Sequence, residues 1–227
     1  MPKRIPRAMS TIERAHWARH ELMCGVDEVG RGCLAGPLVT AAVILHPGAT
    51  CALLKDSKLL SAADRERAAR WIKQHSWYAY GMASHHEIDV FNIYQATLLA
   101  MRRAVAHVVC QAPKMPALVV VDAMPLSFAD DGLKVMAIDH FPEAEQRSIS
   151  VAAASIIAKV KRDELMGVFA ALFPGYALEA HKGYATHAHR MCVAQQGHCL
   201  IHRQSFLHEW FRDETKVSYE RQIELFG

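Results

Sequence analysis

The order of apolar and polar positions along the chain predicts five strands. Two apolar, β-branched runs near the start are separated by a glycine-rich turn, which is the pattern of paired strands. Later runs are short and apolar, and one of them ends on Asp122. The strands are predicted over residues 24–29, 38–45, 77–83, 118–121 and 134–138.

Three longer stretches carry apolar residues at helical spacing. The first begins after Ser61, a residue type that favours the helix N-cap. The second runs over residues 92–109, and the third over residues 148–172, where Pro174 and Gly175 end it. Strands and helices in this order predict an α/β protein with a mixed five-stranded sheet flanked by helices, followed by a C-terminal helical extension.

The length of 227 residues suits one domain with a small addition. We predict a flexible basic tail over residues 1–21, an α/β domain over 22–173 and a helical region over 174–227. No apolar run approaches the roughly 20 residues of a membrane span, and the first thirty residues lack a secretory signal. A soluble cytoplasmic protein is therefore expected.

Charge and cysteine content restrict the function only slightly. The formal net charge of +3 is accounted for by Lys3, Arg4 and Arg7 in the tail, so the rest of the chain is close to neutral. A nucleic-acid enzyme of this composition must concentrate its positive charge locally. Six cysteines occur without a C-x-x-C pair, which indicates reduced thiols rather than a disulfide framework or a zinc ribbon.

Three acidic residues fall at the predicted ends of strands. Asp27 and Glu28 follow the first apolar run, and Asp122 ends the fourth. Sheets that carry helices bind ligands beyond strand ends, so these acids can converge. Neighbouring residues in a regular strand point to opposite faces. We therefore expect the first strand to end or kink at Asp27 and Glu28, with Gly30 and Gly32 supplying the backbone freedom.

Acids that converge in this way favour a metal ion. Two carboxylates ~4 Å apart repel by about 4 kcal/mol at an effective dielectric constant of ~20, so the group is stable only when protonated or bound to a cation. Oxygen ligands select Mg²⁺ or Mn²⁺. Two such ions ~4 Å apart can activate water and stabilise the leaving oxygen of a phosphodiester. An isolated Asp-Glu pair is more often surface charge, and only the glycine turn and the later acids favour a site.

Six groups of residues, in order along the chain, resemble the bacterial ribonuclease HII family. The similarity extends from about residue 22 to residue 207, and six matches in the right order are specific. The matching segments are DEVGRG (27–32) with AGPLV (35–39), DSKLLS (56–61), VDA (121–123), SVAAASIIAKV (150–160) with Arg162 and Asp163, HKGYAT (181–186) and HRQSF (202–206).

This resemblance implies a ribonuclease H-like catalytic domain over residues 22–173 and a substrate-binding region over 174–227. It implies an endonuclease that hydrolyses the RNA strand of RNA/DNA hybrids and cuts 5′ of ribonucleotides embedded in duplex DNA. The implied products carry 5′-phosphate and 3′-hydroxyl ends, and the implied roles are ribonucleotide removal and RNA primer removal. A monomer is expected, with Mn²⁺ or Mg²⁺ held by Asp27, Glu28 and Asp122.

The resemblance also implies a fourth acid, where the sequence departs from the usual pattern. In the family it normally belongs to a Gly-Asp pair five residues before the serine that opens the alanine-rich helix. Counting back from Ser150 reaches Glu145, which Ala144 precedes. Glu143 and Asp139 are the alternatives.

Further residues are implied to bind the substrate. Gly30, Arg31 and Gly32 resemble the turn that recognises the ribonucleotide 2′-OH and the adjacent phosphates. Tyr184 resembles a tyrosine that packs on the next deoxyribose. Asp56, Ser57 and Lys58 cap a helix, contact phosphate, or do both. Ser155, Lys159 and Arg162 share a helix face that either follows a phosphate backbone or is solvated.

Two other functions remain open from the sequence. A hybrid-binding module without catalysis would follow if the altered Gly-Asp position had abolished the chemistry. A zinc phosphoesterase would follow if His187 and His189, with His181 and His198, bound zinc. Their spacing is loose, and we expect these histidines to lie at the surface or to face nucleic acid.

Overall fold

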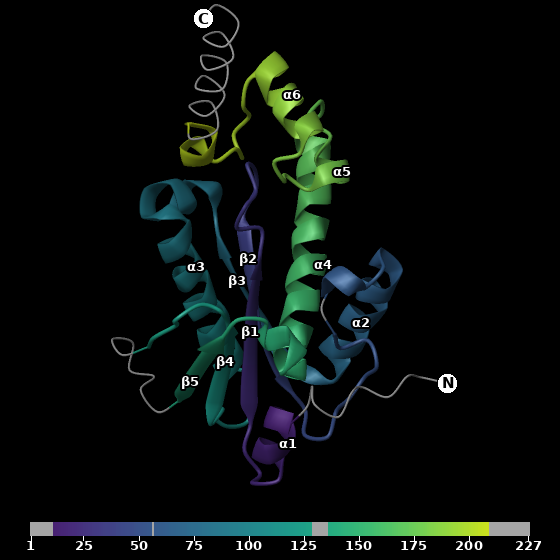
Figure 1. The fold of residues 1–227 in the computed structure, drawn as a ribbon, viewed down its shortest axis with the longest axis vertical. Helices are drawn as coiled ribbons and strands as arrows, with labels where there is room; N and C mark the ends of the chain where they lie inside the picture. Colours follow the sequence, from purple (N-terminus) through teal and green to yellow (C-terminus); the bar gives the residue numbers. More distant parts are fainter. Residues whose placement is uncertain (1–10, 56, 129–135, 209–227) are drawn as a thin grey trace, which may run out of the picture.

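Five strands form one mixed sheet at the centre of the protein (Figure 1). The structure is a computed structural model, and it describes residues 11–55, 57–128 and 136–208. The strand order is β3-β2-β1-β4-β5: β1 pairs antiparallel with β2 and parallel with β4. The predicted five-stranded mixed sheet is confirmed. The strands are β1 (Met23–Val29), β2 (Leu38–Leu45), β3 (Ser76–Ala83), β4 (Leu118–Asp122) and β5 (Ala137–Phe141).

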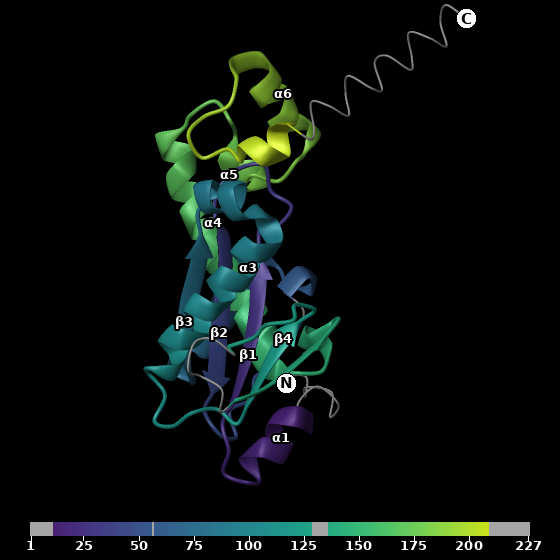
Figure 2. The ribbon, with the colours of Figure 1, turned by 90° about the vertical axis from the view of Figure 1, so that its left-hand side faces the viewer.

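Helices cover both faces of the sheet (Figures 1 and 2). One face packs against α3, and the other packs against α4 and α2. β2 is buried at every position because it lies between these layers, which explains its continuous apolar sequence. The helices are α1 (Thr11–Trp17), α2 (Ala62–Gln74), α3 (His85–Val109), α4 (Ile149–Leu172), α5 (Leu178–His181) and α6 (His187–Gln196), with short 3-10 helices η2 (Ser57–Leu59) and η3 (Ala144–Gln146).

The first turn of α4 lies directly on β1, and this contact requires a glycine. A Cβ atom on Gly25 would come within 2.2 Å of the Ser150 backbone. Ser148 caps the helix, because its side chain accepts a hydrogen bond from the Val151 amide. The helix with its start at Ser148 and its end before Pro174 is thus confirmed, and β1 is held against the helix that carries several predicted site residues.

The boundaries of α3 and β5 differ from the predictions. α3 begins at His85, where Ser84 and Glu87 form a capping box, and it is kinked at Asn92. Asn92 has a positive φ of 64°, and its side chain accepts hydrogen bonds from the next amides. The helix start that was predicted at residue 92 therefore corresponds to a second cap within α3, which the Asn92 side chain provides. The fifth strand was predicted too early: residues 134–135 lie outside the described residues, and β5 follows β4 along its whole length, from Ala137 to Phe141.

The predicted flexible tail over residues 1–21 contains a helix in its second half. Residues 1–10 lie outside the described part, but α1 is ordered against the start of α4. The buried Glu13 carboxylate accepts hydrogen bonds from the Ser148 hydroxyl at 2.6 Å and from the Ser150 amide at 3.0 Å. The expectation of flexibility is wrong for α1, because this buried acid satisfies polar groups at the end of another helix.

The C-terminal part, residues 174–208, lies at the far end of α4 (Figure 1). Its apolar side chains share a core with Leu34, Ala35 and Met166, which belong to the β1–β2 turn and to α4. The region therefore packs on the sheet domain. Within the described residues, no helix combines the length and the apolar character that crossing a membrane requires.

Candidate active site

A pocket of about 290 Å³ lies where β1 and β4 end. It collects residues from six separate stretches of the chain, so only the fold brings them together. Most of the predicted site residues line it. The lining residues are Asp27, Glu28, Val29, Gly30, Arg31, Gly32, Ser57, Lys58, Arg65, Asp122, Glu145, Ser155, Lys159 and Tyr184.

Asp27 and Glu28 share this pocket without a break in the strand. The expected kink is wrong, because β1 stays paired with β2 through Val29. β4 ends at Asp122, however, so no strand of the described part of the chain lies beside the last residues of β1 on that edge. Both side chains reach the pocket at the open edge, although they start from opposite faces of the sheet.

The other two acids approach from the β4 side. Asp122 is the last residue of β4, and one of its carboxylate oxygens accepts a hydrogen bond from the Ala144 amide at 3.0 Å. Glu145 follows in η3 and is 7% exposed. Glu143 and Asp139 are exposed and do not line the pocket. Among the three residues considered for the fourth position, the structure therefore places only Glu145 in the pocket.

Burial and mutual repulsion make this pocket unfavourable for negative charge. Burial, followed by the Glu28 charge, raises the pKa of Asp27 well above its usual range. Burial raises the pKa of Glu28 to about 7, although the Arg31 guanidinium opposes the change. Arg31 lies 3.5 Å from the Glu28 carboxylate. Both shifts disfavour the joint ionisation of the acids, which a bound cation would favour.

The residues of the pocket fit a hard divalent cation. Carboxylate oxygens are the ligands that Mg²⁺ and Mn²⁺ prefer, and Glu28 Oε2 is buried without a hydrogen-bond partner among the described residues. As the side chains stand, no three His, Cys, Asp or Glu residues within the described ranges are grouped tightly enough to hold an ion. Two of the acids are turned toward backbone amides instead: Glu28 N-H donates to Asp27 at 2.7 Å, and Ala144 N-H donates to Asp122.

The glycine turn after β1 forms another wall of the pocket. Gly30 has a φ of +93°, and a Cβ atom there would lie 2.2 Å from the Arg162 side chain. Gly32 has no atom within 4 Å of its hypothetical Cβ position, so the backbone is open to a ligand on that side. Arg31 is half-exposed beside Glu28. The turn presents main-chain groups and one cation to the pocket.

Polar groups from η2 and α4 also line the pocket. Ser57 Oγ and Ser155 Oγ are 3.0 Å apart, which joins the two elements. Lys58 and Lys159 line the same pocket, and Lys159 also pairs with Asp163 at 2.8 Å. Asp56, predicted to belong to this group, lies outside the described residues. Both lysines thus bring positive charge to the pocket.

Arg162 does not lie at the surface, so its predicted role in following a phosphate backbone needs correction. The side chain has 0% exposure and donates hydrogen bonds to backbone carbonyls. The stretch from Ser155 to Arg162 covers nearly two turns of α4, over which the environment changes from the pocket to the core of the C-terminal part. Helical spacing alone does not reveal this change.

Tyr184 lies at the rim of the pocket and is 37% exposed. A β-bridge joins it to Cys33 in the turn. Lys159 Nζ is 5.4 Å from the centre of its ring. The tyrosine is therefore fixed beside the turn with part of its ring accessible, as the predicted contact with a sugar requires.

Arg65 is a residue of the pocket that the sequence analysis missed. It belongs to the first turns of α2, and it donates hydrogen bonds to the Ser57 carbonyl at 3.2 Å and to the Leu60 carbonyl at 2.6 Å. Its position just after the DSKLLS segment was the available signal. Arg65 fixes the backbone that carries Ser57 and Lys58.

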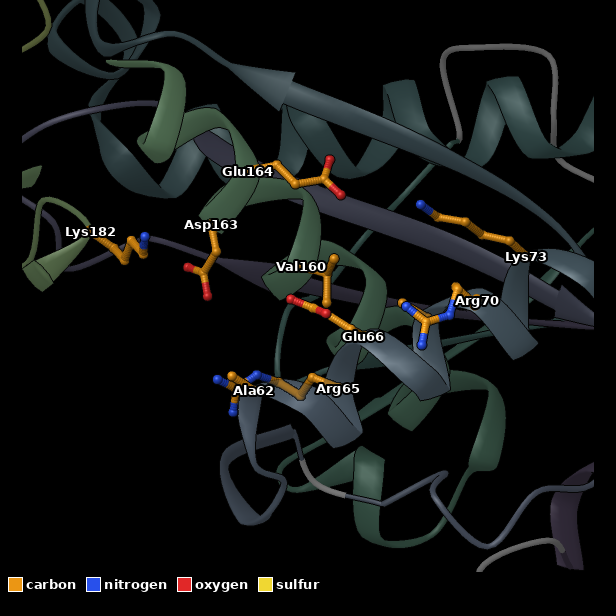
Figure 3. A pocket seen from close by; sticks show the side chains of 10 residues that line it. Ala62, Arg65, Glu66, Arg70, Lys73, Val160, Asp163, Glu164 and Lys182 are labelled. Atoms are coloured by element: carbon orange, nitrogen blue, oxygen red, sulfur yellow. The ribbon is translucent and has the colours of Figure 1, made fainter. Parts of the chain in front are cut away.

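Arg65 also lines a second pocket, of about 470 Å³, between α2 and α4 (Figure 3). Acidic and basic side chains from both helices surround it. Asp163 and Glu164 are already paired with Lys159 and Lys161. Because both signs of charge occur around this pocket, its electrostatics favour no single class of ligand.

Two histidines of the C-terminal part, His189 and His202, form an internal network. This corrects the expectation of a surface position for His189, whereas His187 and His198 are exposed as expected. His189 and His202 are buried, with their Nε2 atoms 3.1 Å apart. His202 Nδ1 lies 2.9 Å from the Cys199 amide, and His189 Nδ1 lies 2.9 Å from the Tyr184 carbonyl. These partners assign His202 as the Nε2-H donor to a neutral His189. His181 stacks on His189, and both ring nitrogens of His189 are engaged, which leaves none for zinc.

The sheet order and the acidic pocket at its strand ends define the class as ribonuclease H-like. Solved structures agree with this. A ribonuclease H2 from Pyrococcus horikoshii OT3 superposes with a TM-score of 0.66 at 25% identity, covering 81% of this chain and 93% of that chain. The RNase HII in a PCNA complex from Archaeoglobus fulgidus gives a TM-score of 0.63 at 25% identity, covering 81% and 94%.

Sequence comparisons define the family within this class. Residues 24–209 match the family described as ribonuclease HII. A ribonuclease HII of Chlorobium chlorochromatii is 44% identical over 202 residues, which cover 86% of this chain and 93% of the relative. Another, of Maricaulis maris, is 45% identical over 196 residues and covers 86% of each. The chain belongs to the ribonuclease HII family and is an enzyme of the ribonuclease H type.

Proposed function

We propose that this enzyme hydrolyses the RNA strand of RNA/DNA hybrids and cuts duplex DNA on the 5′ side of embedded ribonucleotides. Family membership supports ribonuclease H endonuclease activity. The observation that carries the metal-dependent mechanism is the gathering of four acids in one largely buried pocket. Asp27, Glu28, Asp122 and Glu145 would hold two divalent ions, either Mn²⁺ or Mg²⁺.

The protein residues would bind and orient the substrate around those ions. When bound, two divalent ions supply activation of the attacking water and charge stabilisation at the leaving oxygen. The Gly30–Gly32 turn would accept the ribonucleotide, with its 2′-OH recognised rather than used as the nucleophile. Lys58, Ser155 and Lys159, which line the same pocket, would bind phosphate oxygens.

Tyr184 would set the position of the cut. Its ring is accessible beside the turn, where it can pack against the sugar on the 3′ side of the ribonucleotide. A deoxyribose fits this contact better than a ribose. The additional 2′-hydroxyl of a ribose would crowd the tyrosine ring or lose the water that hydrates this hydroxyl. A ribonucleotide followed by DNA would therefore be cut on its 5′ side. Removal of ribonucleotides from DNA and removal of RNA primers, by a monomer, are the roles that we propose.

The products of cleavage test this function. Duplex DNA with one ribonucleotide is incubated with Mn²⁺, with Mg²⁺ or with EDTA, and the ends are identified by mass spectrometry. We expect metal-dependent cutting that leaves a 3′-hydroxyl and a 5′-phosphate. A 2′,3′-cyclic phosphate as the main product would instead show attack by the ribose hydroxyl and overturn the proposed mechanism.

A hybrid-binding module without catalysis is the second candidate. The observation in its favour is the Ala144-Glu145 pair, which replaces the Gly-Asp of the usual family pattern. The same assay decides between the nuclease and the binding module. A catalytically inactive module binds the duplex but yields no cleavage products with either metal.

A further inference from the structure

Two arginine side chains are completely buried beneath the turn that joins β1 to β2. Arg162 comes from α4 and Arg203 from the segment after α6, and both have 0% exposure. Within the described part of the chain, neither forms an ion pair with a carboxylate. Asp89, which acts on Arg203 at longer range, accepts hydrogen bonds from the Gln204 and Ser205 amides. A guanidinium buried without a paired acid is costly, so its hydrogen bonds matter.

Arg203 binds the turn through three carbonyl groups. Its Nη2 donates to the Gly30 carbonyl at 2.7 Å, and its Nη1 donates to the Arg31 carbonyl at 2.7 Å. Nε and Nη2 also donate to the Gly36 carbonyl at 3.1 and 3.0 Å. The planar fork thus holds both ends of the turn at once, which a lysine ammonium cannot match.

Peptide geometry gives these bonds a consequence on the other side of the backbone. In a trans peptide, the C=O of one residue and the N-H of the next point in opposite directions. When the Gly30 and Arg31 carbonyls point at Arg203, the amides of Arg31 and Gly32 point away from it. Those residues line the active-site pocket.

Arg162 holds the neighbouring backbone in the same manner. It donates to the Ala35 carbonyl at 3.1 Å and to the Pro37 carbonyl at 3.0 Å. A third bond, of 2.8 Å, reaches the Lys182 carbonyl, two residues before Tyr184. The turn and the tyrosine segment are therefore fixed to one helix.

We infer that Arg203 is a positioning residue for ribonucleotide recognition, which aims the Arg31 and Gly32 amides at the 2′-OH of the ribonucleotide and at the phosphate oxygen beside it. The inference rests on the proposed function and deepens it. Hydrogen bonding of the carbonyls to a cation polarises the same peptide units and strengthens their N-H groups as donors. The unpaired charge beneath the turn also favours an anion above it. Arg203 acts through the turn and does not touch the substrate.

Binding without cleavage tests the inference. Fluorescence anisotropy in EDTA gives the Kd for a duplex with one ribonucleotide and the Kd for an all-DNA duplex of the same sequence. The ratio of these two Kd values does not depend on the fraction of folded protein. Arg203→Lys and Arg203→Met are compared with Arg103→Met. Arg103 likewise donates to a backbone carbonyl, that of Met82, and to the Glu87 carboxylate, but it is remote from the pocket.

We expect Arg203→Lys to reduce the preference for the ribonucleotide duplex about tenfold, with affinity for the all-DNA duplex changed less than about twofold. Arg103→Met should keep the native preference. An unchanged ratio in Arg203→Lys, or an equal loss of affinity for both duplexes, would overturn the inference. So would a native protein that cleaves with Mn²⁺ yet binds both duplexes equally. A native protein that does not cleave contradicts the proposed function instead.

A spectroscopic measurement covers the case in which Arg203→Met fails to fold. In ¹⁵N-¹H spectra, the Arg31 and Gly32 amide resonances should move in Arg203→Lys and stay in place in Arg103→Met. Unmoved resonances in a folded Arg203→Lys protein would show that the turn does not depend on the guanidinium.

Discussion

At the residue scale, the four acids of the pocket differ in how firmly the protein holds them. Asp27 and Asp122 each accept a hydrogen bond from a backbone amide, whereas one oxygen of Glu28 is buried without a hydrogen bond among the described residues. Such a site is electrostatically unfavourable until a cation enters. Charge, rather than shape, is therefore the property that substitutions in this pocket test.

Replacing Asp27 or Asp122 by asparagine should remove a metal ligand while keeping the size of the side chain. We expect turnover to fall more than about a hundredfold, which exceeds the loss from mutating a residue that only supports a ligand. Affinity for the hybrid should change little, and relief of repulsion should raise the melting temperature of the metal-free protein. Steady-state kinetics and calorimetry check this, and near-normal turnover in either variant would disprove the metal assignment.

The fourth acid can be tested within one short segment. Glu145→Gln should cost at least about tenfold in activity with Mn²⁺, whereas Glu143→Gln and Asp139→Asn should be nearly neutral, because only Glu145 lines the pocket. The exposed acids serve as matched controls for loss of a negative charge nearby. Equal effects of the three substitutions on kcat would show that the position is misassigned.

Tyr184 should discriminate between two substrates. Tyr184→Ala is expected to lose more activity on a single embedded ribonucleotide than on a continuous RNA/DNA hybrid. The lost contact between the ring and the sugar should be worth ~1 to 3 kcal/mol, by analogy with base stacking on aromatic side chains. Values of kcat/KM for both substrates, under one metal and salt condition, give this factor. An equal loss on both would reduce Tyr184 to a packing residue.

At the scale of elements, the strands and the long helices could be predicted because their sequences carry local patterns. β2 is apolar throughout, and Ser61 and Ser148 are caps with visible side-chain chemistry. The burial of Arg162 and of His189 could not be predicted, since Arg162 binds backbone carbonyls far along the chain and His189 binds a histidine of the segment after its own helix. The pocket acids could be named from the motifs, but their joint access at an open strand edge depends on where β4 ends.

The histidine network between α6 and the following segment predicts sensitivity to acid. Burial, together with the nearby His189, lowers the pKa of His202 to about 4. In the unfolded chain, histidine takes up a proton near pH 6.5, so the folded protein binds fewer protons below that pH. Stability is fully present above pH 6.5 and is lost toward pH 4, by up to about 1.4 kcal/mol per pH unit for each such histidine.

His202→Phe should therefore be less stable than the native protein at pH 7, and the difference should shrink as the pH falls to 4.5. Thermal unfolding at a series of pH values measures it, with the exposed His187→Gln as the control that follows the native curve. A constant difference across the range would mean that His202 is not held neutral.

At the scale of the whole molecule, α4 connects the parts that the function requires. It covers one face of the sheet, carries Ser155 and Lys159 at the pocket, and ends in the core of the C-terminal part. That part supplies both Tyr184 and Arg203, and it shares its apolar core with the β1–β2 turn. The β1–β2 turn is thus held by residues of α4 and of the C-terminal part, which lie more than 120 residues further along the chain.

The pocket acids should also make metal-dependent stability vary with pH. The raised pKa values of Asp27 and Glu28 mean that the metal-free folded protein binds more protons than the unfolded chain between about pH 4 and 7. Its stability therefore falls as the pH rises through this window. Added Mn²⁺ competes with those protons, so the increase in melting temperature on adding Mn²⁺ should grow from pH 5 to pH 7.5. Asp27→Asn should flatten this trend, and a pH-independent increase in the native protein would contradict it.

The contact between α1 and α4 has a consequence for the order of events during synthesis. Glu13 is made early, but Ser148 lies 135 residues further along the chain, and Ser150 lies 137 residues further. The growing chain must keep this carboxylate in water until the start of α4 has left the ribosome. Contacts between such distant residues form late, because closing a long loop comes first. The first helix of the described residues is thus among the last to dock.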